Sequence, residues 1–380
     1  MILKFKKILA IFLSYFLLVF SSTAQCRQEP SRGLFVSVIQ DPPVFSSRRA
    51  IQELVDFAKK TRTQTLFVQV YRANKSWFSS KIADSSPYEM SFKNVGEDAF
   101  RLLIKKAHAQ GIKVHAWLNL LSLSTNVNAP LLKKYGPEIL TRNLKEKNTV
   151  DDYKIDNQYF LEPGDLRVQD ALSAIVGEVV SAYPELDGIQ LDYIRYPDVH
   201  PAYGFTKMNM DRFKKSTGIY KIDGEGAAWK QWKYDQVTGL VRRLVRKARS
   251  IHPGIQASTT GLMPYSRASL ESFQDWHYWL QSGLVDFVTL MCYTDDVDGF
   301  KKYIFNAKNK IGDLKKINIA VGAYKLLALP DTFKKQFEIC EESGSRACVV
   351  LHYGSLTQNP ALTGALTDRK NVKPFSAENV

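Results

Sequence analysis

The chain has 380 residues, of which 45% are hydrophobic and 24% charged, and its formal net charge is +14. This length suffices for one large domain or two of ordinary size. The positive excess suits an acidic polymer or an envelope surface, but no basic run is dense enough for a nucleic-acid tract. We therefore expect no nucleic acid among the partners.

The first residues predict export. A basic start is followed by an apolar run over residues 8–20 and by the small residues Ser22, Thr23 and Ala24. This is the pattern of a secretory signal peptide over residues 1–24, and its apolar run is too short to span a membrane. We expect the mature protein in the periplasm, on the cell surface or secreted. Cys26 leaves a second interpretation open, a lipoprotein that touches the membrane only through a lipid on this residue.

Cysteine usage does not indicate a disulfide scaffold, because four cysteines are too few for a chain of this length. Cys340 and Cys348 are close enough in sequence to consider as a pair. Their neighbours are apolar, however, and small buried cysteines are common. We therefore expect buried free thiols.

Short β-branched or aromatic runs alternate with longer amphipathic stretches along the rest of the chain. The predicted strands are residues 33–39, 65–71, 113–120, 188–194, 255–260, 287–293, 317–324 and 347–353. The predicted helices are residues 48–60, 98–110, 167–183, 229–252, 275–282, 299–310 and 331–342.

This alternation predicts a single α/β domain, a (β/α)8 TIM barrel over residues 32–360. A short linker, 25–31, would precede it, and a tail, 361–380, would follow. A doubly wound open sheet is the alternative, but no glycine-rich phosphate loop follows the first strand. The long connections 122–165 and 198–228 follow the third and fourth strands. In a barrel both lie at the carboxyl-terminal rim, where we expect them to wall a cleft.

Asp192 is the first candidate for chemistry. Strand alternation places Gln190, Asp192 and Ile194 on one face, and near the carboxyl end of a barrel strand the inward face looks into the active site. An unpaired buried carboxylate costs several kcal/mol, so it is rarely chosen for packing. The structural alternative is a salt bridge with Arg195 or Arg72. Asp187 starts the same strand at the opposite end, where we expect a structural role.

Glycoside cleavage needs a second carboxyl group. Asp295, with Asp296 beside it, follows the sixth predicted strand, and Glu162 lies in Leu161-Glu-Pro-Gly164 before a helix. Either aspartate could instead cap the next helix, and Glu162 could organise the turn before Pro163.

Sugar sites also need flat apolar faces and forked hydrogen-bond donors. Such side chains recur at the predicted strand ends: Tyr71, Arg72, His115, Trp117, Asn119, Arg195, Tyr196, Tyr293 and His352. One aromatic residue at a strand end is usually packing, but packing does not require the pattern at most strands. The six histidines show no metal-ligand spacing and no cofactor motif is present. We therefore expect no metal or cofactor, which also disfavours a polysaccharide deacetylase.

At these residues the chain resembles the glycosyl hydrolase-like family 10 proteins, also called domain of unknown function 187. The resemblance covers roughly residues 32–353 and rests on six segments in order: 32–36, 67–72, 107–119, 161–164, 187–197 and 229–232. It implies a TIM-barrel hydrolase of the bacterial envelope, with members acting on peptidoglycan glycan strands, and Asp192 as a catalytic residue. Two positions depart from the family pattern. Glu162 stands where Asp or Asn is common, and Tyr71 where Arg is usual, which leaves Arg72 displaced by one position.

A fainter similarity links the fourth and sixth strands to family 18 chitinases, through Asp187-Gly-Ile-Gln-Leu-Asp192 and Met291-Cys-Tyr293. The catalytic glutamate of those enzymes would fall at Ile194, which cannot donate a proton, so we do not expect their substrate-assisted cleavage without another acid. Our leading hypothesis is a glycoside hydrolase with a polysaccharide substrate. Its rival is a catalytically inactive glycan-binding barrel.

Overall fold

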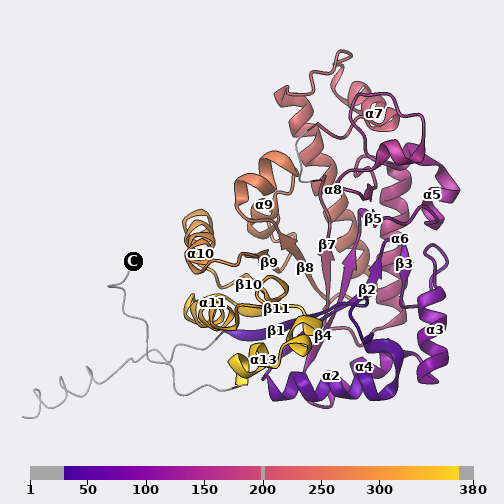
Figure 1. The fold of residues 1–380 in the computed structure, drawn as a ribbon. Coiled ribbons are helices and arrows are strands. Elements are labelled where there is room, and N and C mark those ends of the chain that lie inside the picture. Colours follow the sequence, from indigo (N-terminus) through magenta and orange to yellow (C-terminus); the bar gives the residue numbers. More distant parts are fainter. Residues whose placement is uncertain (1–29, 198–201, 368–380) are drawn as a thin grey trace, which may run out of the picture.

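The computed structural model describes residues 30–197 and 202–367, and it confirms the predicted TIM barrel. Eight parallel strands form the closed sheet, and the first, drawn in indigo, pairs with the last, drawn in yellow, as well as with β2 (Figure 1). The barrel strands are β1 (Ser31–Val36), β2 (Thr65–Arg72), β4 (Lys113–Asn119), β7 (Gly188–Asp192), β8 (Gln256–Gly261), β9 (Phe287–Met291), β10 (Ile317–Gly322) and β11 (Ala347–Leu351).

Amphipathic helices surround the barrel and bury their apolar faces against the sheet. They are α2 (Arg48–Lys60), α3 (Ser86–Val95), α4 (Ala99–His108), α6 (Leu166–Ala182), α8 (Ala227–Ile251), α9 (Trp276–Gln281), α10 (Val297–Ile311) and α11 (Pro330–Glu342). Within residues 30–197 and 202–367, no helix combines the length and apolarity needed to cross a membrane.

The fold continues past the predicted end of the barrel. Two short helices, α12 (Tyr353–Gln358) and α13 (Pro360–Thr367), follow the last strand, and α13 packs against α11. Its Leu362 and Leu366 are buried, and the carbonyl of Leu366 accepts a hydrogen bond from Arg32 at the start of the barrel. Residues 361–367, predicted as the first part of a tail over 361–380, therefore belong to the folded domain. The predicted signal peptide, 1–24, and residues 25–29 of the predicted linker lie outside the described residues, whereas Ser31, the last residue of that linker, begins β1.

Strand alternation separates two apolar layers. Outward side chains of the strands pack against the helices in the larger cluster. The second, smaller cluster fills the barrel interior and consists of Phe35, Phe67, Trp117, Phe287, Ala320, Ala347 and Val349. Because the interior is filled below, a ligand has access only from the rim.

Both long connections lie at the carboxyl-terminal end of the barrel, as predicted, and each contains secondary structure. The first holds the two-stranded sheet β5 (Ser122–Ser124) and β6 (Tyr159–Phe160) together with α5 (Pro130–Tyr135). The second holds α7 (Lys207–Thr217). In Figure 1, α5 and α7 lie above the same end of the barrel. An additional short strand, β3 (Lys75–Ser76), folds back on the end of β2.

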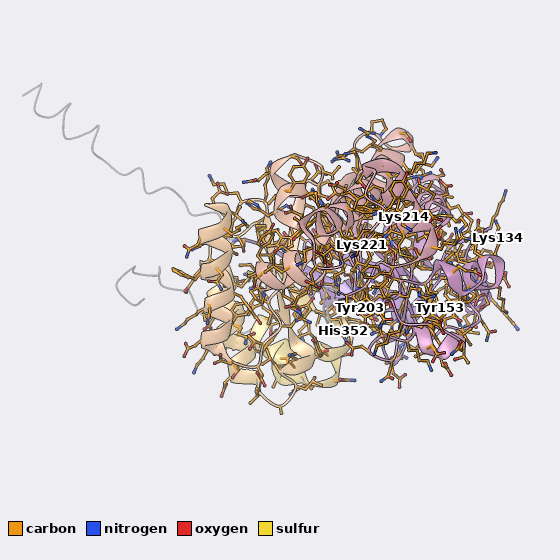
Figure 2. All side chains as sticks on the ribbon, turned by 90° about the horizontal axis from the view of Figure 1, so that it is seen from above. Lys134, Tyr153, Tyr203, Lys214, Lys221 and His352 are labelled. Atoms are coloured by element: carbon orange, nitrogen blue, oxygen red, sulfur yellow. A yellow bond between two sulfur atoms is a disulfide. The ribbon has the colours of Figure 1, made fainter. Side chains whose placement is uncertain are left out.

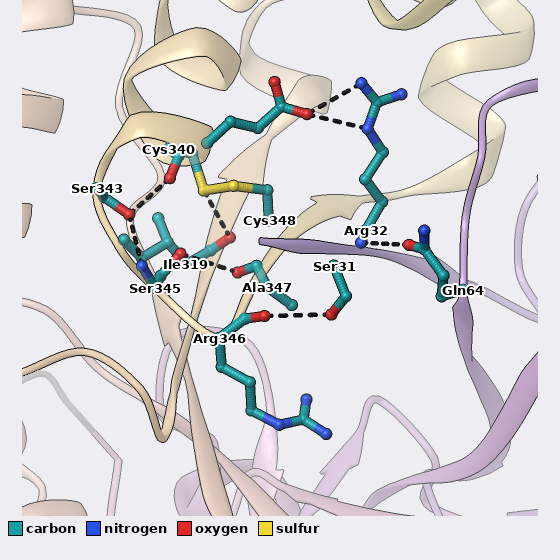
Figure 3. The surroundings of a disulfide bond; sticks show 11 residues. Ser31, Arg32, Gln64, Ile319, Cys340, Ser343, Ser345, Arg346, Ala347 and Cys348 are labelled. Atoms are coloured by element: carbon teal, nitrogen blue, oxygen red, sulfur yellow. Dashed lines mark hydrogen bonds and ion pairs between the residues drawn. A yellow bond between two sulfur atoms is a disulfide. The ribbon is translucent and has the colours of Figure 1, made fainter. Parts of the chain in front are cut away.

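The expectation of free thiols at Cys340 and Cys348 is wrong, because these two residues form a disulfide (Figure 3). The chain reverses between α11 and β11 within eight positions, which brings the two Cα atoms to 5.8 Å, a normal separation for a disulfide. The apolar neighbours suggested that each cysteine is only a buried packing residue. Both cysteines are buried, but they are also bonded to each other. Cys292, by contrast, is a buried free thiol.

Candidate active site

A cavity of about 390 Å³ opens at the carboxyl ends of the barrel strands. Its walls come from strand ends and from the loops that follow them. The lining residues are Phe35, Gln69, Arg72, Trp117, Asn119, Asp192, Tyr193, Arg195, Thr260, Leu262, Met263, Arg267, Met291, Tyr293, Tyr303, Tyr324, Lys325 and Leu351. Predicted site residues that meet here are Arg72, Trp117, Asn119, Asp192, Arg195 and Tyr293.

Asp192 ends β7 and is surrounded by hydrogen-bond donors. Its Oδ1 accepts from the backbone N–H of Tyr193 at 2.7 Å and from the Thr260 hydroxyl at 2.5 Å. Its Oδ2 accepts from the Trp117 indole N–H at 2.9 Å. Arg195 Nη1 lies 3.8 Å from Oδ1, so the ion pair weighed from the sequence is present. The groups of Tyr193, Thr260 and Trp117 all donate hydrogen bonds to the carboxylate. Because Oδ2 accepts only one of them, it can accept a further hydrogen bond from a ligand in the cavity.

Arg72 reaches the cavity because of a β-bulge. Gln69 pairs with Trp117 and Tyr71 pairs with Leu118, so Val70 is an extra residue on β2. The bulge turns Tyr71 away from the barrel interior. The Tyr71 side chain is nevertheless buried, and its hydroxyl accepts a hydrogen bond from Asn74. Arg72 then takes the inward direction and lines the cavity. The one-residue departure from the family pattern therefore leaves an arginine in the pocket.

The pocket carries more positive than negative charge. Among its described lining residues the cations are Arg72, Arg195, Arg267 and Lys325, whereas Asp192 is the one carboxylate. The Arg195 side chain is 7% exposed, its guanidinium lies over the Tyr193 ring at 4.5 Å, and its Nη1 has no hydrogen-bond partner in the described part of the chain. A buried guanidinium with a vacant donor favours a ligand that supplies acceptor oxygens.

Two further contacts shape the floor and wall. Asn119 accepts a hydrogen bond from Gln69 at 2.9 Å, and the Trp117 ring meets Phe35 edge-on at 4.8 Å. Burial, and next the charge of Asp192, raise the pKa of Tyr293 well above its usual value. The Tyr293 hydroxyl therefore remains protonated and can donate a hydrogen bond into the cavity.

The expectation that Ile194 shares the inward face of Asp192 is wrong. The strand ends at Asp192, and Tyr193 adopts a positive φ of 50°, which breaks the alternation. Ile194 consequently joins the outer apolar layer, while Tyr193 and Arg195 line the cavity. The position equivalent to the chitinase glutamate does not look into this pocket.

Glu162 and Tyr196 lie together but outside the cavity lining. The Tyr196 hydroxyl donates to Glu162 Oε1 at 2.6 Å, and Thr141 donates to Oε2 at 2.9 Å. Glu162 is fully buried, and this burial raises the pKa of its carboxyl group above the usual value. The side chain is enclosed by partners from the two insertions.

His115 and His352 also lie outside the cavity lining. His115 is buried in the barrel interior between Phe67 and Phe287, against Gly188, where a Cβ atom would fall 2.3 Å from the imidazole. Burial lowers the pKa of His115 to about 3, so the ring is neutral. His352 is half-buried, with its Nε2 3.5 Å from the Ser355 hydroxyl.

The two aspartates after β9 differ. Asp296 caps α10 by accepting hydrogen bonds from the backbone N–H groups of Asp298 and Gly299. Asp295 is exposed and lies two residues beyond the cavity residue Tyr293. At the far end of β7, Asp187 accepts from His108 and from the Val114 backbone at 2.8 Å each, which confirms its structural role.

Several pocket residues were not predicted from the sequence. Gln69 and Thr260 lie on the inward faces of their strands, and alternation from Phe67 and from the end of the fifth predicted strand could have found them. Arg267 begins the short π-helix η4 (Arg267–Glu271) after β8, and Lys325 ends the short 3-10 helix η5 (Ala323–Lys325) after β10. Such single-turn helices are too short to show a period in the sequence, so no local pattern marks these two residues.

A parallel barrel with a carboxylate and aromatic side chains at its carboxyl end has the architecture of the TIM-barrel glycosidases. Among solved structures, the β-amylase catalytic domain of Paenibacillus polymyxa is similar with a TM-score of 0.57 and 13% identity, over 89% of this chain and 98% of that one. The α-galactosidase AgaB of Geobacillus stearothermophilus is similar with a TM-score of 0.55 and 11% identity, over 90% and 41%. These likenesses concern the fold.

The chain belongs to the Glycosyl hydrolase-like 10 family, which it matches over residues 31–331. It is also 26% identical over 310 residues to the glycosyl hydrolase DigH of Escherichia coli K12, covering 72% of this chain and 67% of that protein. The same values hold for the protein of that name from Shigella flexneri. The family that the sequence motifs predicted is confirmed.

Proposed function

We propose that this protein is a glycoside hydrolase that cleaves an acidic polysaccharide of the cell envelope or its surroundings, with peptidoglycan glycan strands as the first candidate. The observation that carries the proposal is the Asp192 carboxylate, which faces the cavity at the end of β7 and is fixed by Trp117, Thr260 and the Tyr193 backbone. Glycoside cleavage passes through an oxocarbenium-like transition state, and a fixed carboxylate beside the anomeric carbon stabilises its positive charge.

Asp192 is assigned the role of nucleophile, base or intermediate stabiliser, since every partner within hydrogen-bond distance is a donor to it. The proton for the leaving oxygen then comes from a second carboxyl group. We assign this role to Asp295, which is exposed at the rim just beyond Tyr293. Glu162 is less suitable because both of its carboxylate oxygens accept hydrogen bonds from buried partners.

The excess of cations supports an acidic substrate. Arg72, Arg195 and Lys325 line the same cavity as aromatic groups such as Tyr293 and Tyr324. Aromatic rings offer apolar faces to sugar rings, and guanidinium groups bind carboxylates in a forked geometry. In glycan strands stripped of stem peptides the muramic acid carries such a free carboxylate, and the overall charge of +14 also suits an anionic envelope.

Export supports the same assignment. The predicted signal peptide directs the chain out of the cytoplasm, with a lipid on Cys26 as the alternative route to the envelope. Disulfides persist mainly in oxidising compartments, and Cys340–Cys348 is therefore consistent with a periplasmic, surface or secreted protein.

The second candidate is a catalytically inactive glycan-binding barrel. One observation favours it: among the described lining residues, Asp192 is not accompanied by another carboxylate. Measurable glycan affinity without product after prolonged incubation would select this candidate.

The decisive experiment is incubation with purified peptidoglycan sacculi, intact and stripped of stem peptides, followed by mass analysis of the soluble products. We expect fragments with new reducing ends. Asp295→Asn should lower their yield, whereas Asp298→Asn, an exposed aspartate in the first turn of α10, should not. Absence of new reducing ends from both forms of sacculi and from other envelope glycans would contradict the hydrolase proposal.

A further inference from the structure

A buried polar cluster joins the two insertions beside the cavity. Thr141, Glu162, Tyr196 and Asn209 form it, and we call it the Glu162 cluster. Besides the bonds from Thr141 and Tyr196, Glu162 Oε1 accepts from the Gly164 backbone at 3.1 Å and from the Asn209 side chain at 3.3 Å. All four side chains are at most 1% exposed. Figure 2 looks onto the face that carries both insertions, with Lys134 and Tyr153 from the first and Lys214 and Lys221 from the second.

The local sequence is fitted to this cluster. At Gly164 an added Cβ would lie 2.0 Å from Asn209 Oδ1, so the Glu-Pro-Gly turn needs glycine there. Asn209 also donates to the Gly204 carbonyl and accepts from the Trp232 indole at 2.8 Å each. Burying a carboxylate is unfavourable even when it is hydrogen-bonded, so stability alone is a weak reason for a glutamate at this position.

Tyr196 connects the cluster to the cavity wall. Its backbone N–H donates to the Ser272 carbonyl at 3.0 Å and its ring meets Phe273 edge-on at 5.7 Å, while its hydroxyl is held by Glu162. Tyr196 is therefore fixed at its backbone, ring and hydroxyl.

Arg195, the preceding residue, lacks such anchors. Within residues 30–197 and 202–367 its guanidinium makes the 3.8 Å ion pair with Asp192, and its Nη1 has no hydrogen-bond partner. The guanidinium also lies over the ring of Tyr193, on its own segment. The position of the guanidinium beside Asp192 thus depends on the path of residues 193–196, and Tyr196 anchors one end of that path.

We propose that Glu162 and Tyr196 are positioning residues: their hydrogen bond fixes the segment after β7 and thereby holds Arg195 beside Asp192. Glu162 contacts neither the cavity nor a ligand in this assignment. Glu162 acts through Tyr196. This role explains why the glutamate of the motif at residues 161–164 is buried outside the cavity although the motif lies beside the cavity.

The test compares two tyrosine-to-phenylalanine changes. Tyr196→Phe removes the hydroxyl that Glu162 accepts. The matched control, Tyr183→Phe, removes a buried tyrosine hydroxyl that donates to Asp98 at 2.9 Å, outside the cavity lining. The first readout is the indole N–H resonance of Trp117 in ¹⁵N-tryptophan-labelled protein, because this group donates to Asp192. We expect the resonance to shift in Tyr196→Phe and to stay in place in Tyr183→Phe.

The second readout is hydrolysis, which rests on the proposed glycosidase function. Tyr196→Phe should lower kcat/KM roughly tenfold, as expected for a small displacement of a positioned group, with little further loss when it is added to Arg195→Met. An unmoved Trp117 resonance, or full additivity with Arg195→Met, would overturn the positioning role. A shifted resonance in a protein that cleaves no glycan would sustain the role and refute the glycosidase. If Tyr196→Phe does not fold, Glu162→Gln replaces it in both readouts.

Discussion

The two ends of β7 carry aspartates with the same side chain and opposite surroundings. Asp187, at the amino-terminal end of the barrel, is closed off by the His108 ring and the Val114 backbone, which tie α4 and β4 to the strand. Asp192, at the carboxyl-terminal end, accepts hydrogen bonds from three donors, but it lies beside an open cavity lined by three arginines and a lysine. Five positions along one strand separate a structural carboxylate from a candidate catalytic one.

The two ends of the barrel differ in whether their charged side chains are already paired within the protein. At the amino-terminal end, Arg32 pairs with Glu341 and donates to the Thr61 and Leu366 carbonyls, and the Cys340–Cys348 disulfide lies nearby (Figure 3). These contacts tie the end of α2, α11 and α13 to the start of β1. At the carboxyl-terminal end, Arg195 keeps an unused donor. Changes at the first end should therefore alter stability, and changes at the second should alter binding and catalysis.

The largest effect is expected from Asp192→Asn. Loss of the carboxylate should lower hydrolysis by ~10²- to 10⁴-fold, the range that general acid–base groups contribute. An amide NH₂ facing Trp117 also leaves that indole without its acceptor, at a cost of about 1–3 kcal/mol in unfolding free energy. Asp187→Asn is the matched control at the other end of β7. It should lower Tm and leave kcat/KM unchanged below Tm; equal losses of activity in both variants would erase the distinction between the ends.

A smaller effect is expected from Arg72→Met. A charge-assisted hydrogen bond to a ligand contributes about 1.5–3 kcal/mol, so affinity for an acidic glycan should fall roughly tenfold to a hundredfold. Arg249→Met removes the same charge at the amino-terminal end, where Arg249 pairs with Asp286. Calorimetric titration of both variants at one salt concentration separates a pocket contact from a net-charge effect. Similar weakening in the two variants would show that the arginine acts through the overall charge.

Sequence periodicity was enough for the barrel, because each strand and helix carries its own burial pattern. Strand alternation placed Asp192 correctly at the inward end of its strand, but it assigned the wrong face to Ile194, two residues later. The failures have local causes: the positive φ of Tyr193 turns Ile194 outward, and the bulge at Val70 exchanges the directions of Tyr71 and Arg72. Neither the bulge at Val70 nor the positive φ at Tyr193 is marked in the sequence by a turn residue such as glycine. The sequence left Glu162 open between a catalytic acid and an organiser of the turn before Pro163, and its carboxylate accepts from the Gly164 backbone in that turn. Its partners Thr141, Tyr196 and Asn209 could not be predicted, because they meet only in the folded chain.

Glu162→Gln tests an acid that lies at the carboxyl-terminal end yet is sealed from the cavity. Burial, with a contribution from Asp165, raises its folded pKa above the unfolded value near 4.5, against the opposing hydrogen bonds. The folded state therefore holds the proton more tightly than the unfolded state, and wild-type stability falls as pH rises from 4.5 through the folded pKa. Glutamine does not titrate. Thermal unfolding should show the variant gaining relative to the wild type between pH 4 and pH 7, and a difference in Tm that does not change with pH would contradict a buried, titrating carboxyl group.

The smallest effect on catalysis is expected at the disulfide. Removing a crosslink that closes a loop of eight positions lowers unfolding free energy by about 2–3 kcal/mol in the chain-entropy account. Cys340→Ala with Cys348→Ala should therefore melt below the wild type, and a reductant should lower the wild-type Tm toward the variant without moving the variant itself. Because Cys348 lies near the start of β11 and Leu351 at its end meets the cavity, kcat/KM below Tm should remain at the wild-type value. A loss of activity in the folded variant would mean that closure at the amino-terminal end controls the pocket geometry, and the two ends of the barrel could then no longer be treated as independent.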